Sequence, residues 1–84
     1  MADLWIGNVD SGTTDDEIRE FLIRYGFPPF DQAQRLPGTG AHPAVLVRFN
    51  DLDEATLRTL QPKVHNMHWK GHTITARIMR EFGH

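Results

Sequence analysis

One sharply bounded amphipathic helix constrains the fold of this sequence more than any other feature. Thr14 and Glu17 fit a capping box, in which each side chain accepts a hydrogen bond from the other residue's backbone N–H at a helix start. Gly26 is typical of a position just beyond a helix end, and the proline pair 28–29 excludes continuation. Between these limits, apolar residues recur at intervals of three and four, which marks one helix face: Ile18, Phe21, Leu22 and Tyr25. A chain with this helix must bury that face against a second layer.

Four β-prone segments provide that second layer. They are separated by turn-forming residues or by helical patterns, and the last two alternate between two side-chain faces. The segments cover residues 4–9, 30–36, 43–49 and 73–79. Residues 37–40 between the second and third segments form a turn or hairpin loop.

A second, shorter helix is predicted between the third and fourth segments. It begins in the acidic run 51–54 and ends at about Gln61, because Pro62 disfavours the helical conformation of the residue before it. Its inner face is expected to carry Leu52, Ala55 or Thr56, and Leu60. Residues 63–71 then form a long loop.

The resulting order β-α-β-β-α-β predicts an α+β fold, the ferredoxin-like sandwich, with two helices on one face of a four-stranded antiparallel sheet. The residues expected to face the helices are Leu4, Ile6, Val9, Ile18, Phe21, Leu22, Phe30, Val45, Val47, Phe49, Leu60, Ile74 and Ala76. The opposite, uncovered face is expected to carry Trp5, Gly7, Ala44, Leu46, Arg48, Thr75 and Arg77. Function on this fold most often lies on that face or in its loops.

Composition narrows the classes of function. A chain of 84 residues holds a single core, so residues 1–84 are expected to form one domain. The sequence has no cysteine, which excludes a disulfide framework and a thiolate metal site. Its only serine, Ser11, is not in a nucleophile motif, and no glycine-rich loop leads into a helix. We therefore expect that the protein is not an enzyme and that it holds no metal and no cofactor. We also expect a monomer without a membrane span, located in the cytoplasm or in a eukaryotic nucleus.

Two segments resemble the signatures of the RNA recognition motif (RRM) family. Leu4–Val9 follows the six-residue signature, and Trp5 occupies the position whose ring stacks on a base. The eight-residue signature falls on His42–Phe49, where Ala44 and Leu46 replace its first and second aromatic residues. The resemblance extends over nearly the whole chain and implies the same sandwich fold.

The resemblance implies that the open sheet face binds single-stranded RNA or single-stranded DNA. Trp5 would stack on a base, while Ala44 and Leu46 would give apolar contact. Basic side chains would meet phosphates or base edges: Arg48, Arg77, Arg35, Lys70 and Arg80. Because each base stacked on an aromatic side chain contributes about 1–3 kcal/mol, a face without two of its aromatic rings implies weak binding.

The formal net charge of −2 argues at first against a nucleic-acid partner. Along the chain, however, the charges separate. Residues 32–50 and 63–80 contain no acidic residue and carry Arg35, Arg48, Lys63, Lys70, Arg77 and Arg80. Seven of the eleven acidic residues fall at the two predicted helix starts: Asp15, Asp16, Glu17, Glu20, Asp51, Asp53 and Glu54. We therefore expect a basic sheet side and an acidic helix side.

A protein-interaction domain is the alternative hypothesis. The segment 66–72 is similar to the protein-binding UHM variants of the same family, in which an acidic helix and an Arg-x-Phe loop hold a tryptophan of a peptide. Asp16 and Glu20 would then represent the acidic helix, with Met67 and Trp69 at the arginine and phenylalanine positions of the loop. The open sheet face is a second surface for a protein partner. Trp69 is also explained by a structural role, in which its ring packs against a helix end and anchors the loop.

Three histidines lie close together in the sequence, at positions 65, 68 and 72. No cysteine or acidic residue in the same segment completes a tetrahedral metal site. Solvated side chains, or contacts to phosphate or base, are therefore the favoured interpretation, with zinc as the alternative.

Overall fold

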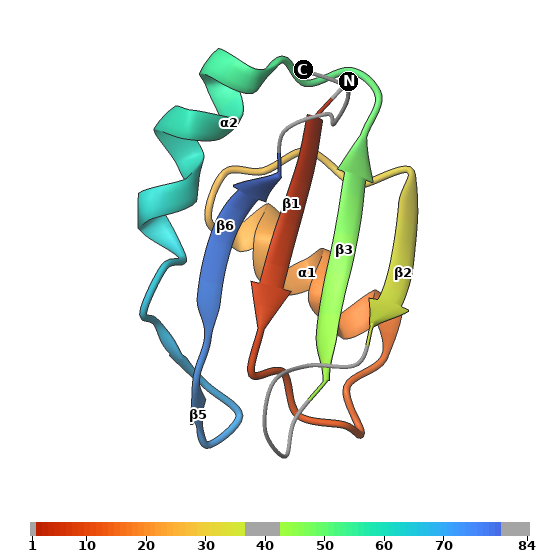
Figure 1. The fold of residues 1–84 in the computed structure, drawn as a ribbon, viewed down its shortest axis with the longest axis vertical. Helices are drawn as coiled ribbons and strands as arrows, with labels where there is room; N and C mark the ends of the chain where they lie inside the picture. The colour runs from red at the N-terminus through yellow and green to blue at the C-terminus, as the bar shows by residue number, and fades with distance from the viewer. Residues whose placement is uncertain (1, 37–42, 80–84) are drawn as a thin grey trace.

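The computed structural model describes residues 2–36 and 43–79, and these form a helix layer packed on one sheet (Figure 1). In chain order the elements are β1 (Ala2–Gly7), α1 (Asp15–Arg24), β2 (Gln32–Leu36), β3 (Ala44–Phe49), α2 (Glu54–Leu60), the 3₁₀ turn η1 (Gln61–Lys63), β4 (His68–Trp69), β5 (His72–Thr73) and β6 (Thr75–Met79). Four strands form an antiparallel sheet in the order β2-β3-β1-β6. The predicted α+β sandwich is confirmed.

The core lies between this sheet and the two helices. Every residue predicted to face inward is buried, and the helix face that begins at Ile18 packs in the same cluster as the central strands. The aromatic ring of Phe49 lies 6.0 Å from that of Phe27 and 6.5 Å from that of Phe30. The sequence patterns did not identify four further core residues: Ala2, Phe27, Leu57 and Val64. Leu52, predicted on the inner face of the second helix, is buried as expected but precedes that helix. None of the helices in residues 2–36 and 43–79 combines the length and apolar character that spanning a bilayer would need.

The capping box at the start of α1 is present as predicted. The Glu17 backbone N–H donates to Thr14 Oγ1 at 3.2 Å, and the Thr14 N–H donates to Glu17 Oε1 at 2.9 Å. The helix ends at Arg24, and Gly26 follows with φ +96°, a left-handed conformation that glycine adopts without strain. Local signals therefore determine both ends of this helix.

The predicted inner face of the second helix was wrong in part. The N-cap is Asp53, whose Oδ1 accepts a hydrogen bond of 2.7 Å from the Thr56 N–H. From this start the helix buries Leu57 and Leu60, which are three residues apart, and leaves Ala55 and Thr56 exposed. The acidic run 51–54 contains two aspartates that could each cap the helix. The residue at which the helix begins determines which of its side chains face the core.

The segment predicted as a long loop contains regular structure. A hairpin pairs β4 with β5, and its two turn residues, Lys70 and Gly71, have φ of 53° and 82°. Positive φ at both central residues is the requirement of a type I′ hairpin turn. Strands of two residues carry too little alternation to be recognised from sequence.

Leu57→Ala is expected to lower the free energy of unfolding by about 2–5 kcal/mol, because it leaves a cavity beneath the sheet. The control is Thr59→Ala on the exposed side of the same helix, which should change it by no more than about 0.5 kcal/mol. Urea unfolding of both variants measures these changes. Equal losses of unfolding free energy would contradict the finding that Leu57 faces the core and Thr59 faces outward.

Candidate nucleic-acid interface

The face of the sheet opposite the helices, called here the sheet face, is a grid of side chains fixed by strand register. Its central row runs across the four strands as Gln34, Leu46, Trp5 and Arg77. The row toward the start of β1 is Gln32, Arg48, Asp3 and Met79. The remaining row holds Leu36 and Ala44 on one side, and Gly7 and Thr75 on the other. All residues predicted for this face from alternation lie on it.

The indole of Trp5 lies along its own strand, over Gly7. A Cβ atom added to Gly7 would stand 2.3 Å from Trp5 Cη2 and 2.6 Å from Cζ3, so the ring occupies the space that a side chain would need. The guanidinium carbon of Arg77 is 5.8 Å from the centre of the ring, within cation–π range. The indole is half-buried. An aromatic ring on an open sheet face is a surface on which a base can stack.

Arg48 also lies on the sheet face, but an acidic partner neutralises its charge. Its Nε and Nη2 donate to the two carboxylate oxygens of Asp3 at 2.8 and 3.0 Å, a bidentate ion pair. The side chains are 41% and 21% exposed, respectively. With Arg77 as the other described cation of this face, the sheet face carries one net positive charge, from two arginines and one aspartate.

Ala44 cannot give the contact predicted for it. Its side chain points to the sheet face, yet the residue has no exposed surface. The register pairs it with Leu36 of the edge strand. Leu46, the neighbour in the central row, is half-buried and keeps some accessible surface.

Two of the predicted basic contacts lie on the helix side instead. Arg35 Nη2 donates to the Thr13 carbonyl at 2.7 Å and to Asp15 Oδ1 at 2.8 Å. Lys70, in the hairpin turn, pairs with the carboxylate of Glu17. Arg80 lies outside the described residues. The predicted contrast between a basic sheet side and an acidic helix side is therefore smaller than expected, because these two of its six basic residues pair with carboxylates at the start of α1.

Trp69 packs as the structural interpretation predicted. Its ring stacks on Phe21 of α1 at 4.3 Å between centroids and an interplanar angle of 20°, which anchors the β4–β5 hairpin to the helix. A depression of about 360 Å³ beside this pair includes Glu20. Asp16 instead pairs with Arg19 at 2.7 Å, and Met67 packs against the core. The four residues predicted for a peptide pocket are thus not brought together in one site.

The three histidines are directed to different places. His65 Nδ1 accepts a hydrogen bond of 3.2 Å from the Ala76 N–H, and His72 Nε2 lies 3.6 Å from Asp10 Oδ1. His68 is exposed on the hairpin. In residues 2–36 and 43–79, no group of three or more metal-ligating side chains comes together.

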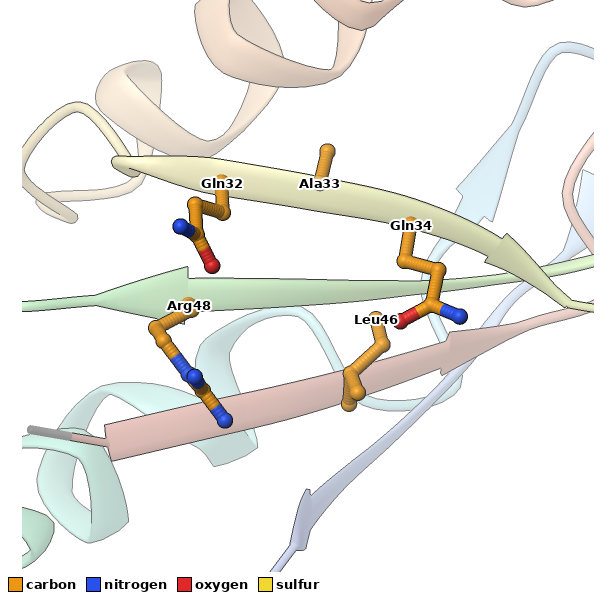
Figure 2. Close-up of a pocket in the computed structure, with 5 residues that line it drawn as sticks. All are labelled: Gln32, Ala33, Gln34, Leu46 and Arg48. Atoms are coloured by element: carbon orange, nitrogen blue, oxygen red, sulfur yellow. The ribbon is translucent and has the colours of Figure 1, made fainter.

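A groove lies between β2 and β3 and includes the first two residues of the central row, Gln34 and Leu46 (Figure 2). It encloses about 420 Å³ and is lined by Gln32, Ala33, Gln34, Leu46 and Arg48. The two glutamine side chains extend from the edge strand toward β3, and Ala33 points to the other side of the strand. The sequence patterns did not single out these glutamines, because polar residues on an edge strand are ordinary.

Comparison with solved structures identifies the fold as that of RRM domains. The structure of the third RRM of Pes4 is similar with a TM-score of 0.77 and 17% identity, covering 100% of this chain and 98% of that one. The third RRM of Mip6 gives 0.72 and 18%, covering 92% and 91%. An RNA-binding protein called PG1 gives 0.71 and 14%, covering 100% of both chains. No protein-family model matches the sequence, and the comparison with curated proteins finds no match.

Gly7→Ala is expected to displace the Trp5 ring, because a Cβ atom cannot stand 2.3 Å from Cη2. The ring is the far end of a side chain, so the free energy of unfolding should fall by no more than about 1–3 kcal/mol. In a proton–nitrogen correlation spectrum the indole N–H resonance of Trp5 should shift and that of Trp69 should not. Gly12→Ala is the control and should move neither. An unchanged Trp5 resonance in Gly7→Ala would contradict the placement of the indole over Gly7.

The fold is expected to lose stability in acid through two carboxylates. The hydrogen bond from Lys70, followed by that from the Thr14 backbone, lowers the pKa of Glu17, and hydrogen bonds from Thr56 lower the pKa of Asp53. Both pKa values are lower in the folded chain than in the unfolded chain. The two carboxylates therefore stabilise the fold fully at a pH above their unfolded-state pKa values, and this stabilisation is lost as the pH falls through their folded-state pKa values. Glu17→Gln preserves the capping box but removes the charge, so its urea midpoint should fall less than that of the wild type between about pH 6 and pH 3. Equal falls would contradict the role of Glu17.

Proposed function

We propose that this chain is an RNA-binding module that holds single-stranded RNA on the sheet face, with one base stacked on the indole of Trp5. The observation that carries the proposal is the position of this ring on the sheet face, where it extends over Gly7. Placed this way, the half-buried indole keeps part of its surface accessible on the side opposite the helices. The similarity in fold to RRM domains supports the same interpretation.

The neighbours of Trp5 suit a nucleotide. Leu46 lies beside it on β3 and offers apolar surface, and Arg77 lies beside it on β6. Arg77 is exposed and bears its charge next to the stacking surface, where the phosphate of a stacked nucleotide would pass. With one aromatic ring and one net positive charge, the face is suited to weak binding dominated by short-range contacts.

A protein partner, bound either on this face or at the acidic helix with the segment 66–72, is the second hypothesis from the sequence, and it stays a prediction. The stacking of Trp69 on Phe21 already occupies one side of the ring that the peptide-pocket interpretation requires. This contact disfavours the peptide-pocket form of the hypothesis. An apolar protein contact would also be nearly insensitive to salt, whereas RNA binding would not.

Trp5→Ala is expected to weaken binding to a single-stranded RNA of mixed sequence by about 5- to 150-fold, the equivalent of about 1–3 kcal/mol for one lost stack. Trp69→Phe is the control, since it keeps an aromatic ring on Phe21 and should change the affinity little. Fluorescence anisotropy with labelled RNA, and with DNA of the same sequence, measures both. Equal affinities of Trp5→Ala and the wild type for RNA would contradict the proposal, and tighter binding of DNA than of RNA would reassign the ligand.

Arg77→Gln is expected to reduce the slope of log affinity against log salt concentration by about one, because one phosphate contact is lost. Arg35→Gln removes the same charge from the helix side, where the arginine is held by Asp15, and should leave the slope unchanged. The two variants have the same net charge, so they separate a local phosphate contact from general attraction. A slope that falls equally in both would contradict a contact on the sheet face.

A further inference from the structure

Two glutamine amides on the sheet face have no structural role among the described residues. Gln32 and Gln34 stand two positions apart on the edge strand β2, so their side chains emerge on the same face about 7 Å apart. Both are exposed, and within residues 2–36 and 43–79 neither side-chain amide has a hydrogen-bond partner. The third glutamine differs, because the Gln61 amide donates to the Ala76 carbonyl inside the fold.

The amides line the groove of about 420 Å³ described above, and the groove adjoins the Trp5 platform. Gln34, Leu46 and Trp5 are consecutive members of the central row, so the groove begins one strand spacing, about 4.8 Å, from the indole. Figure 2 shows both glutamines directed from β2 toward β3, with Leu46 and Arg48 directed across the sheet toward β1. The volume falls within the range of small-ligand sites.

The chemistry of this groove fits a base better than a phosphate. Arg35 on the same strand is turned to the helix side and held by Asp15, and the charge of Arg48 is neutralised by Asp3. What remains accessible is an apolar surface from Leu46 and two primary amides. Each amide offers donors and an acceptor side by side, which is the complement of a base edge.

We infer that the groove holds a second base of the bound strand, next to the base on Trp5, and that Gln32 and Gln34 select this base, with adenine preferred. Adenine presents an amino donor beside a ring-nitrogen acceptor, and glutamine pairs with these two groups bidentately. Leu46 would support the flat side of the base. This inference rests on the proposed RNA-binding function and adds to it the residues that determine sequence preference.

The test compares short oligomers of adenosine, cytidine and uridine, of equal length and at fixed salt. The wild type should bind the adenosine oligomer at least about fivefold more tightly than the others, the value of one good bidentate pair. In Gln32→Ala/Gln34→Ala this ratio should fall to within about a factor of two, while binding to the uridine oligomer should change little. Both residues are exposed on an edge strand, and thermal unfolding should show that the double variant is folded.

The control is Thr75→Ala, on the opposite edge strand of the same face, which should retain the adenosine preference. If the wild type shows no preference or prefers another base, or if the double variant retains the adenosine preference, the inference is overturned while the RNA proposal stands. Loss of the preference in Thr75→Ala as well would also overturn it. If the wild type binds none of the oligomers, the RNA proposal itself fails.

Discussion

The close contact between the Trp5 indole and Gly7 is the feature on which the proposed site depends. The ring can extend along the strand because the residue two positions further on has no side chain. In this position the ring lies between Leu46 and Arg77 in the central row, within cation–π distance of Arg77. A larger residue at position 7 would displace the indole from this place.

Ion pairs then determine how much charge the face can contribute to binding. Arg35 and Lys70 belong to the start of α1, where Asp15 and Glu17 hold them, and Asp3 neutralises Arg48. Attraction of a polyanion from a distance is therefore weak, in agreement with the overall charge of −2. Affinity on such a surface must come from stacking, from Arg77 and from hydrogen bonds made at contact.

The features that sequence could predict are those set by neighbouring residues. The capping box, the apolar helix face and the alternation of β3 and β6 identified the order of elements and an inward-facing set that is buried throughout. The errors arose where two candidates compete or where distant segments meet. Asp51 and Asp53 compete as helix caps, so the inner face of α2 was misplaced. Arg35 and Lys70 pair with acidic residues that are 20 and 53 positions away in the sequence. Local sequence pattern therefore could not predict that these two cations lie away from the sheet face. The burial of Ala44 likewise depends on neighbouring strands.

A chemical-shift titration of the isotope-labelled chain with single-stranded RNA tests the central claim most directly, because it reports every surface in one experiment. The account predicts that the largest shifts occur at the Trp5 indole N–H and at the amides of Leu46 and Arg77, with smaller ones along β2. Shifts concentrated on α1 and the β4–β5 hairpin around Trp69, with the sheet face unchanged, would contradict it.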